Sequence, residues 1–235
     1  MIHEFPPHGR IIDAEVRERE DGEHELVGCV EVYEDEDLKG ETQIPLLDRT
    51  IPIALNEDES GEVIFYNRTF EGEADQRDIN EIVEVLDAEA TREGKRSFEL
   101  LPVLKIAGKY ALGAIATGFF GKIGADAYDA LKGKVKELMT RKAEETDECL
   151  LVFNPMVEVD GRLVEVKVIL TNPSNEDIDA FFDDGLRKLD QILPKHITDD
   201  SMKRMVYEFE GPEIELKFGV RTDAVPLDPQ VSRSD

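Results

Sequence analysis

Few side chains of this sequence have the type and spacing that catalysis requires. The chain contains four histidines, His3, His8, His24 and His196. None of them falls in a recognisable nucleophile or metal-binding motif. The two cysteines, Cys29 and Cys149, lie too far apart for a Cys-x-x-Cys site, and both are expected to be reduced and structural. The residue types therefore predict no catalytic residue, no metal ligand and no cofactor.

The acidic segment 56–61 has the best spacing for a metal ion. Asn56, Asp58, Ser60 and Gly61 match positions of a calcium-binding loop, but Asn67 stands where a bidentate glutamate is needed. A solvated hairpin loop is the simpler interpretation. Carboxylates from separate parts of the chain could still meet in the fold, so one enzymatic hypothesis stays open, a metal-dependent hydrolase or nuclease. A rise in melting temperature with Ca²⁺, Mg²⁺ or Mn²⁺ would support it.

The segment 95–143 differs most from its surroundings, because it is rich in glycine and alanine. Gly113, Thr117, Gly121 and Ala125 recur at every fourth position, which aligns small residues along one face if the segment is helical. Small residues let a second backbone come close. The spacing therefore predicts an interaction seam formed by these four residues.

A run of uncharged, mostly apolar residues lies inside this segment, at 110–121. It is apolar nearly all round, so it is expected to be covered by protein or by lipid, and it is too short to span a membrane alone. In a membrane-bound state, Lys109 and Lys122 would reach anionic headgroups while Phe119 and Phe120 enter the acyl boundary. Three interpretations of this run are thus open: a buried core helix, an oligomer seam, or a membrane-active helix within 102–143.

Charge divides the chain into three parts. The whole sequence has a formal net charge of −26, yet residues 95–143 hold ten Lys or Arg against four acids. Strong overall acidity argues against a nucleic-acid partner, since phosphate contacts need basic side chains. It favours a protein partner or self-association.

The N-terminal part, 1–94, is predicted to be an acidic β-rich domain with one helix. Strands are expected at 10–20 and 23–34 around an Asp-Gly turn, at 42–47 and 50–55 as edge strands, and at 63–70. Asp78 is expected to cap a helix from Ile79 to Arg92. A long central helix is expected to begin at Pro102 and to break between Gly118 and Gly124.

The C-terminal part, 144–222, is predicted to have the order β-β-α-β-β. Asp160-Gly161 joins a hairpin of 149–159 and 162–171, Ser174 caps a helix that Pro194 ends, and a second hairpin pairs 205–210 with 213–221. Residues 223–235 are expected to be a disordered tail. Together these elements indicate an α+β fold.

The sequence thus favours a non-enzymatic, cytoplasmic binding protein that associates through its Gly/Ala-rich central helix. No basic and apolar secretory leader precedes the first strand. The alternative is a membrane-acting effector, peripheral to the membrane, whose basic apolar helix is shielded by acidic domains.

Overall fold

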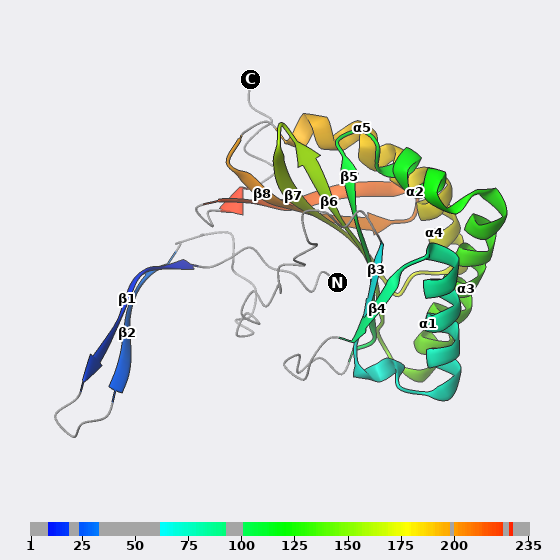
Figure 1. Ribbon diagram of the computed structural model, residues 1–235, viewed down its shortest axis with the longest axis horizontal. Coiled ribbons are helices and arrows are strands. Elements are labelled where there is room, and N and C mark those ends of the chain that lie inside the picture. Colours follow the sequence, from blue (N-terminus) through cyan, green and yellow to red (C-terminus); the bar gives the residue numbers. More distant parts are fainter. Residues whose placement is uncertain are drawn as a thin grey trace.

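A mixed β-sheet with helices packed on one face dominates the computed structural model, which describes residues 9–18, 24–32, 62–92, 101–197, 200–222 and 226–227 (Figure 1). The strands of this sheet are β3 (Val63–Tyr66), β4 (Glu89–Arg92), β5 (Val103–Ala111), β6 (Leu150–Val159), β7 (Arg162–Thr171), β8 (Met202–Glu210), β9 (Glu213–Arg221) and β10 (Pro226–Leu227). Their order across the sheet is β10-β9-β8-β7-β6-β5-β3-β4. The predicted α+β class is confirmed.

Helices form the crossovers between the parallel strand pairs β3/β4, β5/β6 and β7/β8. They are a short 3-10 turn (Arg68–Phe70), α1 (Glu73–Leu86), α2 (Ile115–Ile123), α3 (Ala125–Glu145), α4 (Asn175–Ala180), a π-helical turn (Phe181–Gly185) and α5 (Leu186–His196). Antiparallel pairing joins β3 to β5, β6 to β7 and β8 to β9. One sheet therefore contains strands from the acidic segment 1–94, from the basic segment 95–143 and from the acidic part that follows it.

A separate two-stranded sheet precedes this body. β1 (Gly9–Glu18) pairs with β2 (His24–Val32) in antiparallel register, as the sequence predicts. Its Asp-Gly turn lies outside the described residues. So do the predicted strands at 42–47 and 50–55 and the calcium-like loop at 56–61.

The main core lies between the helices and one face of the sheet. At its centre is a cluster of five fully or almost fully buried aromatic rings, Phe119, Phe153, Phe181, Phe182 and Phe209. Neighbouring rings in it have centroids 5.3 to 6.2 Å apart. A second apolar cluster lies on the opposite face and contains Val103, Leu150, Val152, Ile169, Val206, Phe218 and Val220. The central strands are therefore buried on both faces.

The predicted central helix is wrong over its first third. Residues 103–111 form strand β5, which lies between β3 and β6, and the helical part begins only at Ile115. A strand that is buried on both faces is apolar on both, so it lacks the alternation that distinguishes a strand from a helix. The predicted break is confirmed at Gly124, where φ is +74° between α2 and α3.

The predicted first helix is misplaced. α1 runs from Glu73 to Leu86, with Gly72 at its N-cap, so Asp78 lies inside the helix and does not cap it. Residues 89–92, expected to complete the helix, form strand β4 beside β3. Asp78 is buried against α3, and a buried acid is easily mistaken for a helix-capping residue when its partner is distant in sequence.

The C-terminal order β-β-α-β-β is confirmed. Asp160 and Gly161 both have positive φ, +50° and +78°, as a tight hairpin turn requires. Ser174 and Asp177 form a capping box at the start of α4. The helix continues through Pro194 to His196, contrary to the expected stop. Within the predicted disordered tail, Pro226–Leu227 form β10 on the edge of the sheet, and the rest lies outside the described residues.

Candidate functional site

Helix α2 is fixed to the body of the protein at its first turn. The backbone N–H groups of Ile115 and Ala116 donate to the two carboxylate oxygens of Asp190 on α5, each at 2.9 Å. A carboxylate at this position satisfies two N–H groups that have no partner within the helix and complements the positive end of the helix dipole. This bond determines which face of α2 points to the sheet.

The inward face of α2 is apolar. Ile115 and Phe119 are fully buried, and the Phe119 ring lies 5.6 Å from that of Phe153 and 6.2 Å from that of Phe182. Phe120 is half-buried, with its ring 4.5 Å from that of Tyr128. Phe119 is thus a core residue of this fold, and the expectation that it enters an acyl boundary does not hold for the folded chain.

The residues of the predicted seam do not lie on one helix. Gly113 is in the turn after β5, with φ of +75°, while Thr117 and Gly121 are in α2 and Ala125 is the first residue of α3. All four are exposed. The seam is therefore not an internal packing surface, and its role as an interaction surface stays a prediction.

The two lysines that flank the uncharged run are placed apart. Lys109 is half-buried in β5 and has partners within the chain. Lys122 belongs to the last turn of α2, and its side chain lies outside the described part of the structure. Among the described helices, none combines the length and the apolarity needed to cross a membrane.

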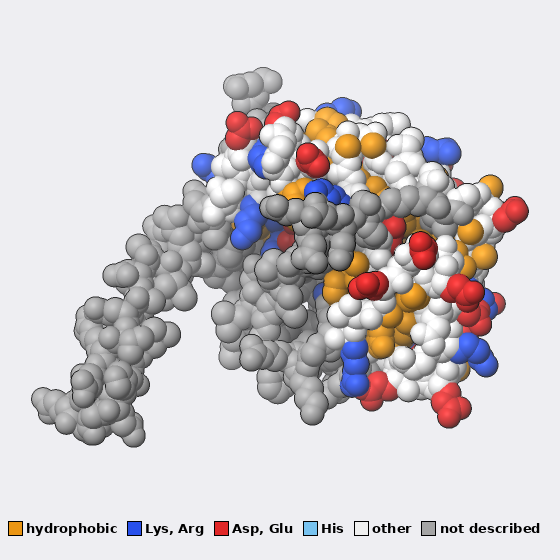
Figure 2. Space-filling model, in the orientation of Figure 1, with side chains coloured by type: hydrophobic (Ala, Val, Ile, Leu, Met, Phe, Trp, Pro, Cys, Tyr) orange, Lys and Arg blue, Asp and Glu red, His pale blue; other side chains and the backbone are white. Residues whose placement is uncertain are grey.

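Helix α3 carries five of the ten basic residues of the central segment and lies between two acidic helices, α1 and α4. On one side, Lys134 Nζ lies 2.7 Å from Glu81 of α1, and Arg141 pairs with Asp75 and Asp78 of the same helix. Figure 2 shows acidic and basic side chains intermingled on the helical side of the molecule. These cations of α3 are therefore paired with acids within the chain.

The other side of α3 pairs with α4 and the π-helical turn. Lys136 binds Asp179, and Lys132 Nζ lies 2.9 Å from Asp183. The hydrogen bond from Lys136 holds the pKa of Asp179 below its ordinary value. Hydrogen bonds to Glu81 and Glu137 raise the pKa of Lys134 to about 12. Asp179 and Lys134 therefore stay charged at neutral pH.

The innermost ion pairs are buried. Asp75 and Lys142 are each 3% exposed, and their charged groups touch. Lys142 Nζ also donates to the carbonyl oxygen of Thr69 at 2.9 Å and lies 5.3 Å from the centre of the Phe70 ring. These ion pairs join α1 to α3, and because each buried charge already has a partner, they offer no free group for chemistry.

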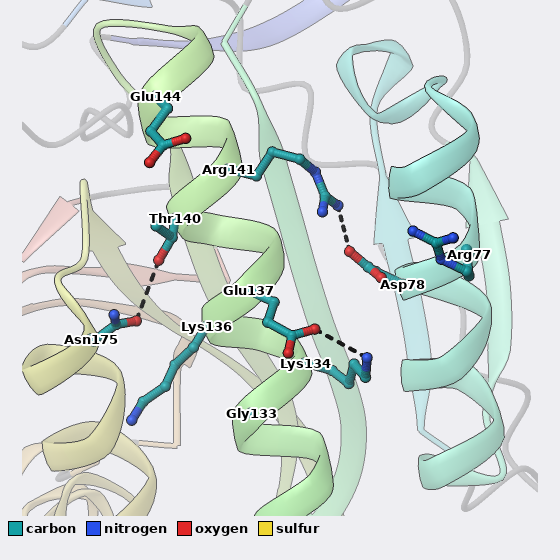
Figure 3. Close-up of a pocket in the computed structure, with 10 residues that line it drawn as sticks. All are labelled: Arg77, Asp78, Gly133, Lys134, Lys136, Glu137, Thr140, Arg141, Glu144 and Asn175. Atoms are coloured by element: carbon teal, nitrogen blue, oxygen red, sulfur yellow. Dashed lines mark hydrogen bonds and ion pairs between the residues drawn. The ribbon is translucent and has the colours of Figure 1, made fainter.

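Between α1, α3 and α4 lies a groove of about 830 Å³ (Figure 3). Its lining residues are Arg77, Asp78, Gly133, Lys134, Lys136, Glu137, Thr140, Arg141, Glu144 and Asn175. Figure 3 shows α3 as the floor, with Arg77 and Asp78 on the α1 side and Asn175 on the α4 side. Thr140 Oγ1 lies 3.3 Å from Asn175 Oδ1 across the floor. The groove is thus open, polar and built by three helices.

Two glycines in these helices have no explanation in the described part of the structure. Gly121 in α2 and Gly133 in α3 are exposed, and a Cβ atom at either position would meet no described atom within 4 Å. By contrast, a Cβ atom on Gly118 would lie 2.9 Å from the ring of Tyr110. Glycine in a helix interior is about 1 kcal/mol less favourable than alanine, so Gly121 and Gly133 lower stability without helping internal packing.

The sequence alone does not identify the acidic partners of α3. Asp78 is expected only as a helix cap, and Asp75 and Asp179 have no assigned role, because acids on a single helix are typical of a solvated face. The signal that points to them is the alternation of acidic, basic and acidic blocks along the chain. Within the described ranges, no three His, Cys, Asp or Glu side chains are grouped to hold a metal ion.

Comparison with known proteins adds no assignment. No protein-family model matches the chain, and no curated protein or solved structure matches it significantly. The function is therefore argued from the geometry of the chain alone.

Proposed function

We propose that this protein is a non-enzymatic, intracellular binding protein that associates with a protein partner, or with a second copy of itself, through the exposed faces of α2 and α3. The observation that carries the proposal is the pair Gly121 and Gly133. Each weakens its helix, and no neighbour among the described residues requires the absence of its side chain. The close approach of another chain at these two positions would explain why both residues are glycine.

The surroundings of Gly121 support association. Gly113, Thr117 and Ala125 are also exposed, and all are small and uncharged. An uncharged surface loses little hydration when it is covered, whereas the remainder of this strongly acidic molecule repels a second copy. The helix that carries this surface is fixed by Asp190, so a partner would meet a preorganised face.

The test is substitution of the two glycines in the full-length chain. Gly121→Leu and Gly133→Leu place bulky side chains in open space and replace glycine by a better helix former, so each variant should be at least as stable as the parent. Sedimentation velocity measures self-association, and affinity capture from extracts of the source cells measures partner binding. A dimer or a captured protein should be lost from at least one Leu variant. If all complexes survive both substitutions, or none forms, the proposal is wrong.

A stability prediction separates the exposed glycines from a packed one. Gly133→Ala should raise the free energy of unfolding by about 1 kcal/mol, because alanine favours the helix and its Cβ meets no atom. Gly118→Ala is the matched control. Its Cβ would clash with Tyr110, whose hydroxyl lies 2.9 Å from Glu62, so it should lower stability by about 1 to 3 kcal/mol. Urea unfolding measures both, and a destabilising Gly133→Ala would contradict the structure.

A membrane-acting effector is the second candidate, and one observation favours it. The cations of α3 are held by acids of α1, α4 and the π-helical turn, which is the shielding that this hypothesis needs. It is weaker than the first proposal because Phe119 is buried and β5 is an inner strand of the sheet. Exposure of the whole segment would require the core to open.

This candidate predicts a difference between the isolated segment and the whole chain. A synthetic peptide of residues 95–143 should bind phosphatidylserine vesicles, since each basic residue near an anionic surface contributes about 1 kcal/mol. Binding should weaken as salt is raised. The intact protein should not bind. Vesicle co-sedimentation measures both, and failure of the peptide to bind would remove the candidate.

A further inference from the structure

The floor of the groove in Figure 3 is one exposed stripe of α3. Gly133, Glu137, Thr140 and Glu144 follow one another at intervals of four, three and four residues, and all are exposed. These intervals keep side chains on one face of a helix, as in the contact seam of a coiled coil. The stripe extends for about 17 Å, three helical turns. It therefore has the length and the spacing of a surface for a second helix.

Gly133 allows such a helix to come close at one end of the stripe. It lacks a side chain, and the space above it is empty for at least 4 Å around the Cβ position. α1 and α4 rise on the two sides of α3, so a ligand on this stripe has lateral walls. The groove fits an elongated ligand better than a flat one.

The charged residues of the stripe on the floor of this groove are acidic. Of the four cations that line the groove, Lys134, Lys136 and Arg141 bind acids of the chain, and Arg77 lies on the α1 wall. Glu137 is 62% exposed although it pairs with Lys134. Glu144 is exposed and makes no ion pair with another described residue. Glu137 and Glu144 are seven residues apart, so they point the same way, two turns from each other.

We infer that this groove docks a helix of a partner protein that carries Lys or Arg at seven-residue spacing along one face and a small residue opposite Gly133. This inference rests on the proposed binding function and names the chemistry of its partner. The formal charge of −26 attracts such a basic helix over long range. A second copy of the chain would bring the same negative charge and is disfavoured as the occupant.

The test uses the full-length protein and a synthetic probe. The probe is a 21-residue, fluorescein-labelled Ala-rich helix with three lysines at seven-residue intervals. A control peptide has the same composition, with its lysines distributed round the helix. Fluorescence anisotropy measures binding of both at low and at physiological salt. The aligned probe should bind at least about tenfold more tightly than the control peptide.

Protein variants locate the bound probe. Glu144→Lys should weaken binding by about tenfold, whereas Glu213→Lys changes the net charge equally on an exposed residue at the start of β9 and should weaken it by less than about threefold. Gly133→Leu, which leaves charge unchanged, should also weaken binding by about tenfold. Circular dichroism of each variant verifies that it is folded.

Equal binding of the two peptides, or equal loss in Glu144→Lys and Glu213→Lys, would overturn the inference, because it would show attraction to net charge only. No binding of the aligned probe would overturn it as well. If a complex is lost through Gly121→Leu and the probe still does not bind the groove, the proposed binding function stands and the groove inference fails.

Discussion

Asp75→Ala should lower the free energy of unfolding by about 3 to 5 kcal/mol, which is among the largest effects expected in this protein. The Asp75 carboxylate binds both Arg141 and Lys142, and the Lys142 side chain is only 3% exposed. Without Asp75, Arg141 keeps Asp78, but among the described residues the buried Lys142 ammonium keeps only the half-exposed Glu145 as an acidic partner. The loss should be seen in urea unfolding as a lower midpoint with an unchanged slope.

Glu81→Ala is the matched control for this prediction. Glu81 also lies on α1 and pairs with a lysine of α3, but its side chain is 39% exposed. Exposed pairs contribute about 0 to 1 kcal/mol, so this variant should stay close to the parent. If Asp75→Ala and Glu81→Ala have equal effects, the buried network does not hold α1 to α3 as described.

Phe119→Ala should lower stability by a similar amount, about 3 to 5 kcal/mol, because it opens a cavity in the aromatic cluster. The ring is fully buried and packs edge-to-face on Phe153 and Tyr128. Thr117→Ala, two residues earlier on the exposed face of α2, should change stability by less than about 0.5 kcal/mol.

Unfolding by urea, followed by the far-ultraviolet circular dichroism of each variant, distinguishes the two faces of α2. A neutral Phe119→Ala would mean that the side chain is not held in the core. That result would also revive the hypothesis that Phe119 is available to a lipid surface. The expected loss, in contrast, leaves the outer face of α2 as the surface through which this helix acts.

The candidate site could be located in the sequence but not assembled from it. The glycine-rich and basic character of 95–143 directed attention to the right segment, and Gly121 and Ala125 are exposed there. The basic charge of this segment does not show which acids it pairs with. In the structure, Lys134 and Arg141 bind acids of α1, more than fifty residues away along the chain. Gly133 can be recognised as a possible contact residue only from the structure, because the groove around it is formed by α1 and α4.

Local chemistry was sufficient where an element depends on its own residues. Asp160-Gly161 adopts the positive φ angles that a tight hairpin needs, the Ser174–Asp177 box starts α4, and Gly124 breaks the central helices. Each of these depends on a side chain or backbone angle within a few residues, so the sequence determined it directly.

Tertiary structure decided the elements whose surroundings come from distant parts of the chain. β5 looks like helix because burial on both faces removes the period of two, and that burial exists only once β3, β6 and the helices are in place. α1 buries Asp75 and Asp78, and the partners that compensate them, Arg141 and Lys142, come from α3. Sequence thus determined the 160–161 turn, the α4 capping box and the break at Gly124, while packing and charge pairing between distant segments decided which face of each helix remains open to a partner.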